Sequence, residues 1–294
     1  MLHEPVHTRP PSRVSPWRQL FASCCVALTL IVAVPARGQP STTQAEIVRL
    51  KTRGETEQAY LLLQRRTPIK SVAVLFTGGF GLLKLRIVDG EIAWDKTGNS
   101  FLVINKDRFV DDATAVAVID APSDQWEFGY TPKVRKSPEH ATDVRGVVND
   151  LKTRFPGARV FLIGTSQGST SAAYAGAALG KDIAGVILTA SVFAAAPASW
   201  RLLHDPNLSD FDFAQIQAPL LIVHHVDDRC VATPYSAAEK LADRYPLIVV
   251  RGGEPTRDNG CGPMGPHGFL GREESVAAEI RNWMHGRPYA RQIE

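Results

Sequence analysis

The sequence lacks an apolar run of the length that spans a membrane. The run at residues 20–34 has 15 residues, whereas a spanning helix needs about 20. A strong charge imbalance is also missing from most of the chain. Residues 1–38 carry four arginines and one glutamate, and the remainder has 29 basic and 29 acidic residues. This balance leaves no basic field that would recruit nucleic acid or an anionic membrane.

The N-terminal segment has the order of a secretory signal. Arg13 and Arg18 precede the apolar run, and residues 34–36 (VPA) place small side chains where a signal peptidase cuts. This order predicts a signal peptide over residues 1–38 and a periplasmic or secreted mature protein without membrane attachment. An uncleaved anchor is one alternative. A lipoprotein site at Cys24 is the other, although most of the apolar run follows that cysteine.

Cysteine is scarce, with four in the chain. Cys24 and Cys25 would leave with the signal peptide, and Cys230 and Cys261 would remain. Two cysteines in an oxidising compartment favour one disulfide. Two unpaired buried thiols are the alternative.

The rest of the chain, residues 39–294, shows no internal repeat and no linker, which indicates one domain. Two alternating stretches predict an antiparallel strand pair at a sheet edge. Stretches that are apolar throughout alternate with stretches whose apolar residues recur at helical spacing, which predicts a mostly parallel sheet with helices on both faces. The strands are expected at residues 46–53, 57–64, 71–76, 115–119, 160–163, 183–188, 219–225 and 246–250. The longer helices are expected at residues 139–155, 236–245 and 270–284.

Three segments carry weaker signals. Residues 82–92 and 125–136 are expected to be loops. His140, in the first turn of a predicted helix, is expected to have a surface or capping role. Residues 189–217 show no strong periodicity. This connection could form a lid or line a pocket, and it is too short for a large cap domain.

The most informative stretch is residues 159–168, which read RVFLIGTSQG. Gly164, Ser166 and Gly168 fit the motif G-x-S-x-G between a buried strand and a helix of small residues. Such a turn strains the backbone of the serine and exposes its hydroxyl near the positive end of the helix. An ordinary glycine-rich turn is the alternative, because the motif alone is frequent by chance.

A serine hydroxyl needs a base within hydrogen-bond reach, and the base needs an acid that fixes its tautomer. In open parallel sheets such groups follow the strands. Asp227 and Asp228 follow one predicted strand, and His267 follows the next through a long loop. The order serine, aspartate, histidine is the one that this motif requires.

A second glycine-rich turn, residues 77–81 (TGGFG), follows the buried strand about 85 residues before the serine. Hydrolases with the serine motif place a backbone N–H donor for the reacting oxygen there. Gly79 or Phe80 is the candidate, and the N–H of Gln167 would be the second donor. Each such donor is worth about 3–4 kcal/mol in the transition state. A plain loop is the alternative.

Together these motifs resemble the α/β-hydrolase superfamily over about residues 60–286, and in particular compact esterases and dienelactone-hydrolase-like enzymes. Residues 224–231 (HHVDDRCV) match the family pattern H-G-x-x-D-x-x-V with histidine for glycine, and this register selects Asp228 over Asp227 as the acid. Residues 267–269 (HGF) match the family's base followed by a helix. Serine stands where dienelactone hydrolases usually carry cysteine, and Thr77 replaces a common histidine.

The resemblance implies a single-domain α/β-hydrolase fold with no large cap and no metal or organic cofactor. It implies an exported serine hydrolase with Ser166, His267 and Asp228 as its triad, acting on small-molecule esters. A peptidase or amidase of the same fold, or an inactive binding module, are the alternatives. His224 and His225 could suggest a metal pair, but adjacent strand residues point to opposite faces. A Cys230–Cys261 disulfide would tie the acid loop to the base loop.

Overall fold

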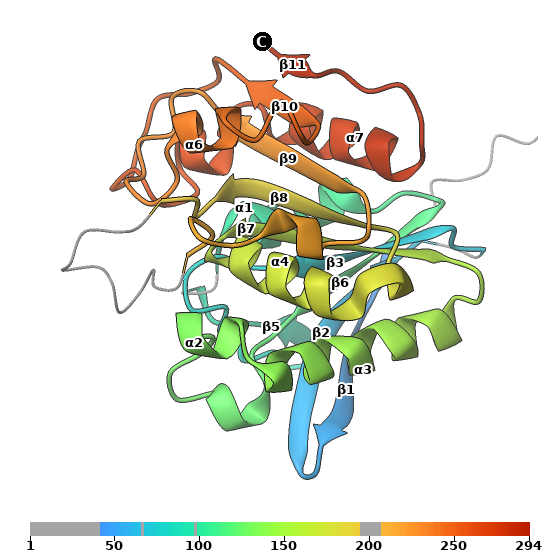
Figure 1. The fold of residues 1–294 in the computed structure, drawn as a ribbon. Coiled ribbons are helices and arrows are strands. Elements are labelled where there is room, and N and C mark those ends of the chain that lie inside the picture. The colour runs from blue at the N-terminus through green and yellow to red at the C-terminus, as the bar shows by residue number, and fades with distance from the viewer. Residues whose placement is uncertain (1–41, 66–67, 97–98, 195–206) are drawn as a thin grey trace, which may run out of the picture. The chain divides into compact units, whose positions relative to one another are not determined.

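The structure, a computed structural model, describes residues 42–65, 68–96, 99–194 and 207–294. The predicted signal peptide lies outside the described residues. A nine-stranded sheet has the order β1-β2-β6-β3-β7-β8-β9-β10-β11 (Figure 1). Its strands are β1 Gln44–Arg53, β2 Thr56–Gln64, β3 Ser71–Phe76, β6 Thr114–Ile119, β7 Arg159–Ser166, β8 Gly185–Ser191, β9 Leu220–His225, β10 Leu247–Val250 and β11 Gln292–Ile293.

All strands from β6 to β11 in this order run parallel, while β1 and β2 pair antiparallel at one edge. The central strands are buried along their whole length, whereas β1 is mostly exposed. This difference explains the sequence pattern, because a strand covered on both faces is apolar throughout and an edge strand alternates. The predicted sheet and its antiparallel edge are confirmed.

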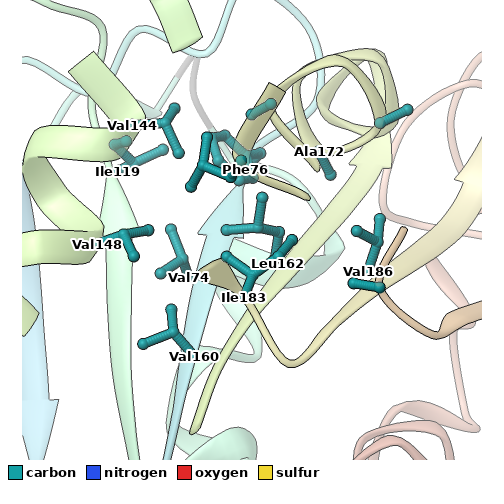
Figure 2. Packing of buried hydrophobic residues seen from close by; sticks show 14 of the residues in the cluster. Val74, Phe76, Ile119, Val144, Val148, Val160, Leu162, Ala172, Ile183 and Val186 are labelled. Carbon is teal, nitrogen blue, oxygen red and sulfur yellow. The ribbon is translucent and has the colours of Figure 1, made fainter. Parts of the chain in front are cut away.

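Helices cover both faces of the sheet and create two apolar cores. One core joins α3, α4 and α6 to the sheet, and the other joins α1 and α7 to the opposite face. Figure 2 shows the first core, where Val144 and Val148 of α3 lie over Val74 and Ile119. The helices are α1 Phe101–Ile104, α2 Pro132–Arg135, α3 Pro138–Arg154, α4 Gln167–Leu179, α6 Tyr235–Glu239 and α7 Glu273–Met284. In the described part of the chain, no helix is both long and apolar enough to cross a membrane.

The parallel order brings distant parts of the chain to one edge of the sheet. The loops after β3, β7, β9 and β10 all leave from the carboxyl ends of neighbouring parallel strands. These loops carry the glycine-rich turn, the serine, the aspartate pair and the histidine, as the rule for open parallel sheets predicts.

Two segments expected to be loops contain regular structure. Residues 82–92 include a small hairpin of β4 Arg86–Val88 and β5 Glu91–Ala93. Asp89 and Gly90 at its turn both have positive φ, 52° and 83°, which is the backbone that an Asp-Gly hairpin turn adopts. The other segment, residues 125–136, contains the single turn α2, which Thr131 caps.

The expected surface or capping role of His140 is wrong. Its side chain is buried against the rings of Phe76 and Tyr130, and the cap of α3 is Ser137. Among the described residues, neither ring nitrogen of His140 has a hydrogen-bond partner. Burial, with the charges of Arg135 and Arg53, lowers the pKa of His140 to about 3.

His224 is equally buried, and burial lowers its pKa to about 4. Together, His140 and His224 predict a loss of stability in mild acid. Both pKa values lie below the usual 6.5 of an unfolded chain, so the unfolded state binds more protons as the pH falls. We expect the two histidines together to lower the free energy of unfolding by about 4 kcal/mol between pH 7 and pH 5. Urea unfolding at both pH values measures this. In His140→Phe, about half of that loss should disappear, and an unchanged pH dependence would contradict the assignment.

Candidate active site

The turn from β7 to α4 holds Ser166 in a strained conformation. Ser166 has φ 52° and ψ −125°, a backbone conformation that residues other than glycine rarely adopt. The flanking glycines are required by close packing. A Cβ on Gly164 would lie 2.2 Å from the carbonyl oxygen of Gly168, and a Cβ on Gly168 would lie 2.1 Å from that of Phe76. The strained turn predicted around Ser166 is therefore present.

Ser169, which the sequence did not single out, supports this strained turn. Its hydroxyl donates a hydrogen bond of 2.6 Å to the carbonyl of Ser166 and accepts one of 3.3 Å from the N–H of Val192. It thus joins the first turn of α4 to the end of β8. A serine in the first turn of a helix was the available signal, but its contact with β8 depends on tertiary packing.

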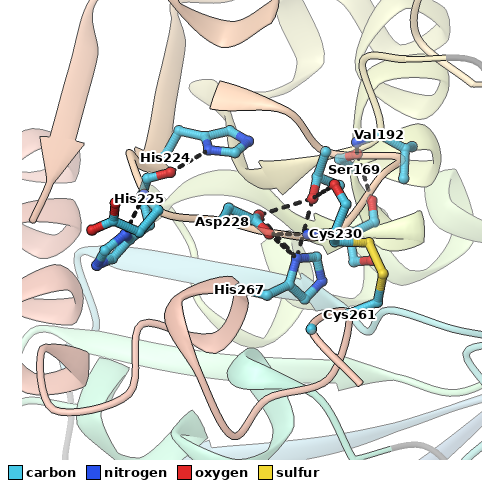
Figure 3. A network of polar contacts seen from close by, with 12 residues as sticks. Ser169, Val192, His224, His225, Asp228, Cys230, Cys261 and His267 are labelled. Carbon is cyan, nitrogen blue, oxygen red and sulfur yellow. Dashed lines mark hydrogen bonds and ion pairs between the residues drawn. A yellow bond between two sulfur atoms is a disulfide. The ribbon is translucent and has the colours of Figure 1, made fainter. Parts of the chain in front are cut away.

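His267 and Asp228, which lie 39 residues apart, meet at the same edge of the sheet (Figure 3). Nδ1 of His267 is 3.0 Å from Oδ2 and 3.2 Å from Oδ1 of Asp228. The side chain of Asp228 is fully buried and that of His267 is 6% exposed. The neighbouring Asp227 is exposed and contacts His225 through its backbone N–H. The geometry therefore agrees with the register that selected Asp228.

Asp228 is held as an anion by several donors. The N–H of Cys230 donates to Oδ1 at 2.9 Å, and the hydroxyl of Thr233 donates to Oδ2 at 2.8 Å. Burial works to raise the pKa of Asp228, but the hydrogen bond and charge of His267 outweigh it and hold the pKa below its ordinary value. Such a carboxylate fixes the imidazole with its proton on Nδ1, which leaves Nε2 free to act as a base.

His267 is followed by a tightly packed turn. A Cβ on Gly268 would lie 2.1 Å from the carbonyl oxygen of Pro263, and Phe269 adopts φ 57°. The ring of Phe269 is buried and packs edge-on against Phe101 at 4.9 Å. The His-Gly-Phe pattern thus reflects a close approach and an anchor that fix the position of His267.

Ser166 and His267 line one pocket with a volume of about 120 Å³. No hydrogen bond joins their side chains within the described residues. Apart from His267, the described wall carries no side chain that ionises, and it is formed largely by the loops around Gly79, Phe101 and Pro263. A pocket of this kind suits a small, uncharged group.

The glycine-rich turn after β3 forms one side of this pocket. Gly78 and Gly79 line it, and a Cβ on Gly78 would lie 3.1 Å from that of Ser166. Phe80 is not among the lining residues and is 47% exposed. Of the two candidates for the backbone donor, the structure therefore favours Gly79. Gln167, the other candidate, is the first residue of α4.

The predicted disulfide between Cys230 and Cys261 is present, with their Cα atoms 4.6 Å apart. Cys230 follows Asp228 by two residues, and Cys261 lines the pocket in the loop that leads to His267. The disulfide therefore joins the loop of Asp228 to the loop of His267 (Figure 3).

We expect loss of this disulfide to lower both stability and turnover. The two cysteines lie 31 positions apart in the sequence. In the chain-entropy model, removing a disulfide that closes a ring of this size lowers the free energy of unfolding by about 3–4 kcal/mol. The variant Cys230→Ser/Cys261→Ser should show this loss in urea unfolding and a kcat reduced several-fold. The unreduced, denatured mature protein should contain no free thiol. Two free thiols per chain would contradict the bridge in the native protein.

The histidine pair His224 and His225 shows no sign of holding a metal. Nε2 of His225 contacts the carbonyl of Gly252 at 2.9 Å, while His224 is buried between Phe193 and Tyr235. In the parts of the chain that the structure describes, no group of three or more histidine, cysteine, aspartate or glutamate side chains could hold a metal ion.

Comparisons with known proteins agree with this architecture. The family model described as serine aminopeptidase, S33, matches residues 123–211, which include β7 and Ser166. A comparison with curated proteins finds no match. The chain is 16% identical to Est1E from Butyrivibrio proteoclasticus, with a TM-score of 0.54, and the match covers 81% of this chain and 98% of Est1E.

Two further solved structures have the same arrangement. Dienelactone hydrolase from Anabaena variabilis is 14% identical, with a TM-score of 0.54, over 83% of this chain and 98% of the other. A lidless α/β serine hydrolase from Xanthomonas campestris is 14% identical, with a TM-score of 0.50, over 85% of this chain and 95% of the other. The described residues form this fold without a large cap, as the sequence predicts. The sheet and these similarities show that the chain has the α/β-hydrolase fold.

Proposed function

We propose that this chain is an exported serine hydrolase that cleaves carboxylic esters through an acyl-enzyme on Ser166. One observation supports the proposal most strongly. His267 contacts the buried Asp228 at the wall of the pocket into which the strained turn places Ser166. A buried acid, a histidine and a strained serine at one pocket are the groups that acyl transfer requires.

In the proposed reaction, Ser166 Oγ attacks the carbonyl carbon of the ester and Nε2 of His267 accepts the hydroxyl proton. Asp228 stabilises the imidazolium that forms. The carbonyl oxygen becomes negative and accepts hydrogen bonds from the N–H groups of Gln167 and Gly79. The imidazolium then donates its proton to the leaving alcohol. Water, deprotonated by His267, attacks the acyl-enzyme and releases the acid.

The substrate class follows from the pocket and from the compartment. The pocket is small, and among its described lining residues no side chain other than His267 can ionise, which suits a short or flat uncharged acyl group. Est1E, a neighbour in fold, has been solved with ferulic acid bound, which is a reason to include aryl esters among the substrates tested. Export through the signal at residues 1–38 would place the reaction in the periplasm or the medium, on small molecules and without a nucleic-acid partner.

A peptidase is the second candidate, favoured by the description of the family model that matches residues 123–211. The chemistry is the same, and the two differ in the leaving group that His267 must protonate. Rates on matched ester and amide substrates, such as alanine p-nitrophenyl ester and alanine p-nitroanilide, separate them.

The test of the proposed function is turnover by the mature protein, residues 39–294. We expect hydrolysis of p-nitrophenyl acetate, p-nitrophenyl butyrate or methyl ferulate, and stoichiometric labelling of Ser166 by a fluorophosphonate. A folded protein that neither labels nor hydrolyses any of these esters or the amide would be an inactive binding module, and the proposal would be wrong.

A further inference from the structure

A buried arginine lies directly behind the glycine-rich turn. Arg135, the last residue of α2, is 1% exposed. No carboxylate among the described residues forms an ion pair with it. Burial lowers the pKa of Arg135 to about 10, so the guanidinium remains charged at neutral pH. An unpaired cation in the interior costs stability unless its donors are satisfied, and its contacts therefore require an explanation.

The contacts of this guanidinium are with the turn that borders the pocket. Nη2 of Arg135 donates a hydrogen bond of 2.8 Å to the carbonyl of Gly79 and a longer one of 3.4 Å to that of Thr77. Nη1 donates at 2.7 Å to the hydroxyl of Ser171 on α4. Arg135 thereby joins the turn to the helix that starts at the proposed nucleophile.

These two carbonyls belong to the peptide groups on either side of the 78–79 peptide, which carries the N–H of Gly79. The 78–79 peptide is held by its own carbonyl, which accepts a hydrogen bond of 3.2 Å from the N–H of Gly81. Because a trans peptide is planar, its N–H points opposite to its C=O. The orientation of the Gly79 N–H is therefore fixed by three contacts, two of which come from Arg135.

Gly81 has no side chain, which leaves room for Tyr130 and Arg135 beside the turn. A Cβ on Gly81 would lie 2.7 Å from the ring of Tyr130 and 3.0 Å from Nη2 of Arg135. Tyr130 packs on the guanidinium, 5.2 Å from its ring centre, and its N–H donates to the carbonyl of Phe80. The turn contains three glycines in five residues, and such a backbone is intrinsically mobile. Arg135 and Tyr130 supply the rigidity that its own residues lack.

We propose that Arg135 is a positioning residue of the hydrolytic reaction, which holds the Gly79 N–H toward the developing oxyanion and adds an unpaired positive charge behind it. This inference rests on the proposed function. A preorganised donor stabilises the transition state more than the bound ester. Loss of Arg135 is therefore expected to lower kcat and to leave KM nearly unchanged.

The test compares Arg135→Met and Arg135→Lys with the wild type and with Arg145→Met. Arg145 is a matched control, because it also contacts a backbone carbonyl, that of Ala178, but its side chain on α3 is 43% exposed and pairs with Asp182. Each kcat is expressed per active site, titrated to completion with a fluorophosphonate. This correction removes the effect of any misfolded fraction.

We expect a kcat about 10- to 100-fold lower in Arg135→Met and about 3- to 10-fold lower in Arg135→Lys, whose ammonium lacks the planar fork that contacts both the turn and the hydroxyl of Ser171. KM should stay within about twofold in both, and Arg145→Met should match the wild type. Wild-type kcat per titrated site in Arg135→Met, or a raised KM with kcat kept, would overturn the inference while the proposed function stands. If Arg135→Met does not fold, Arg135→Lys decides, and an unchanged kcat refutes the proposal. Loss of the function itself would appear as a wild type without turnover.

Discussion

Replacing Ser166 by alanine is expected to lower kcat for p-nitrophenyl butyrate by about 10⁵-fold. The variant keeps the pocket, His267 and the backbone donors, so it can still bind the ester and stabilise an oxyanion. It lacks the only group proposed to form the acyl-enzyme, and water must attack the bound ester without it. Initial rates at saturating substrate, with the burst phase recorded in the wild type, measure the effect.

Two further serine variants make this result specific. Ser209→Ala changes an exposed serine outside the pocket and should retain the wild-type rate. Ser166→Gly should be as inactive as Ser166→Ala but more stable by about 1 kcal/mol, because glycine adopts the φ of 52° at low cost. Equal rates in Ser166→Ala and the wild type would remove this residue from the mechanism.

Asp228→Asn is expected to lower kcat about 10³- to 10⁴-fold near neutral pH. The asparagine oxygen can still accept from the N–H of Cys230, and the hydroxyl of Thr233 can turn to the carbonyl of Cys230 and accept from the amide, so we expect the fold to persist. Its amide group, however, donates where the carboxylate accepted from Nδ1 of His267. The imidazole would then carry its proton on Nε2, where it cannot accept the proton of the serine.

The neighbouring aspartate is the control for this variant. Asp227 is exposed and makes no side-chain contact with His267, so Asp227→Asn should keep kcat within about twofold. Thermal unfolding of both variants shows whether the loss is chemical or structural. The reverse ranking, with Asp227→Asn the more damaged, would show that the acid has been assigned to the wrong member of the pair.

Much of the architecture could be predicted because it depends on local patterns. Central strands such as β3 and β6 are apolar on both faces, and Gly164 is required by a contact within the serine turn itself, whereas Gly168 packs on the carbonyl of Phe76 in β3. The order of Ser166, Asp228 and His267 along the chain, together with the strands before them, was enough to place them at one edge of the sheet. The structure then brought two of these side chains into contact and the third into the same pocket.

The residues that sequence reasoning missed act across the fold. Arg135 lies in one helical turn without periodicity, and an arginine in such a segment usually indicates the surface. Its role depends on Gly79 and Ser171, which lie 56 and 36 positions away. His140 lies four and seven residues before Val144 and Val147, on the buried face of α3, but its polar ring favoured the surface, and the aromatic rings that enclose it come from β3 and the loop before α2. No local pattern contains these partners.

The bond between Cys230 and Cys261 also determines what a protease can remove. Every peptide bond from residue 230 to residue 261 lies inside the covalent ring, which contains α6 and β10. A single cut there leaves the fragment that carries His267 attached to the fragment that carries Ser166. In an extracellular medium rich in proteases, such a nicked chain stays one molecule, and its two fragments separate on a gel only after a reducing agent is added.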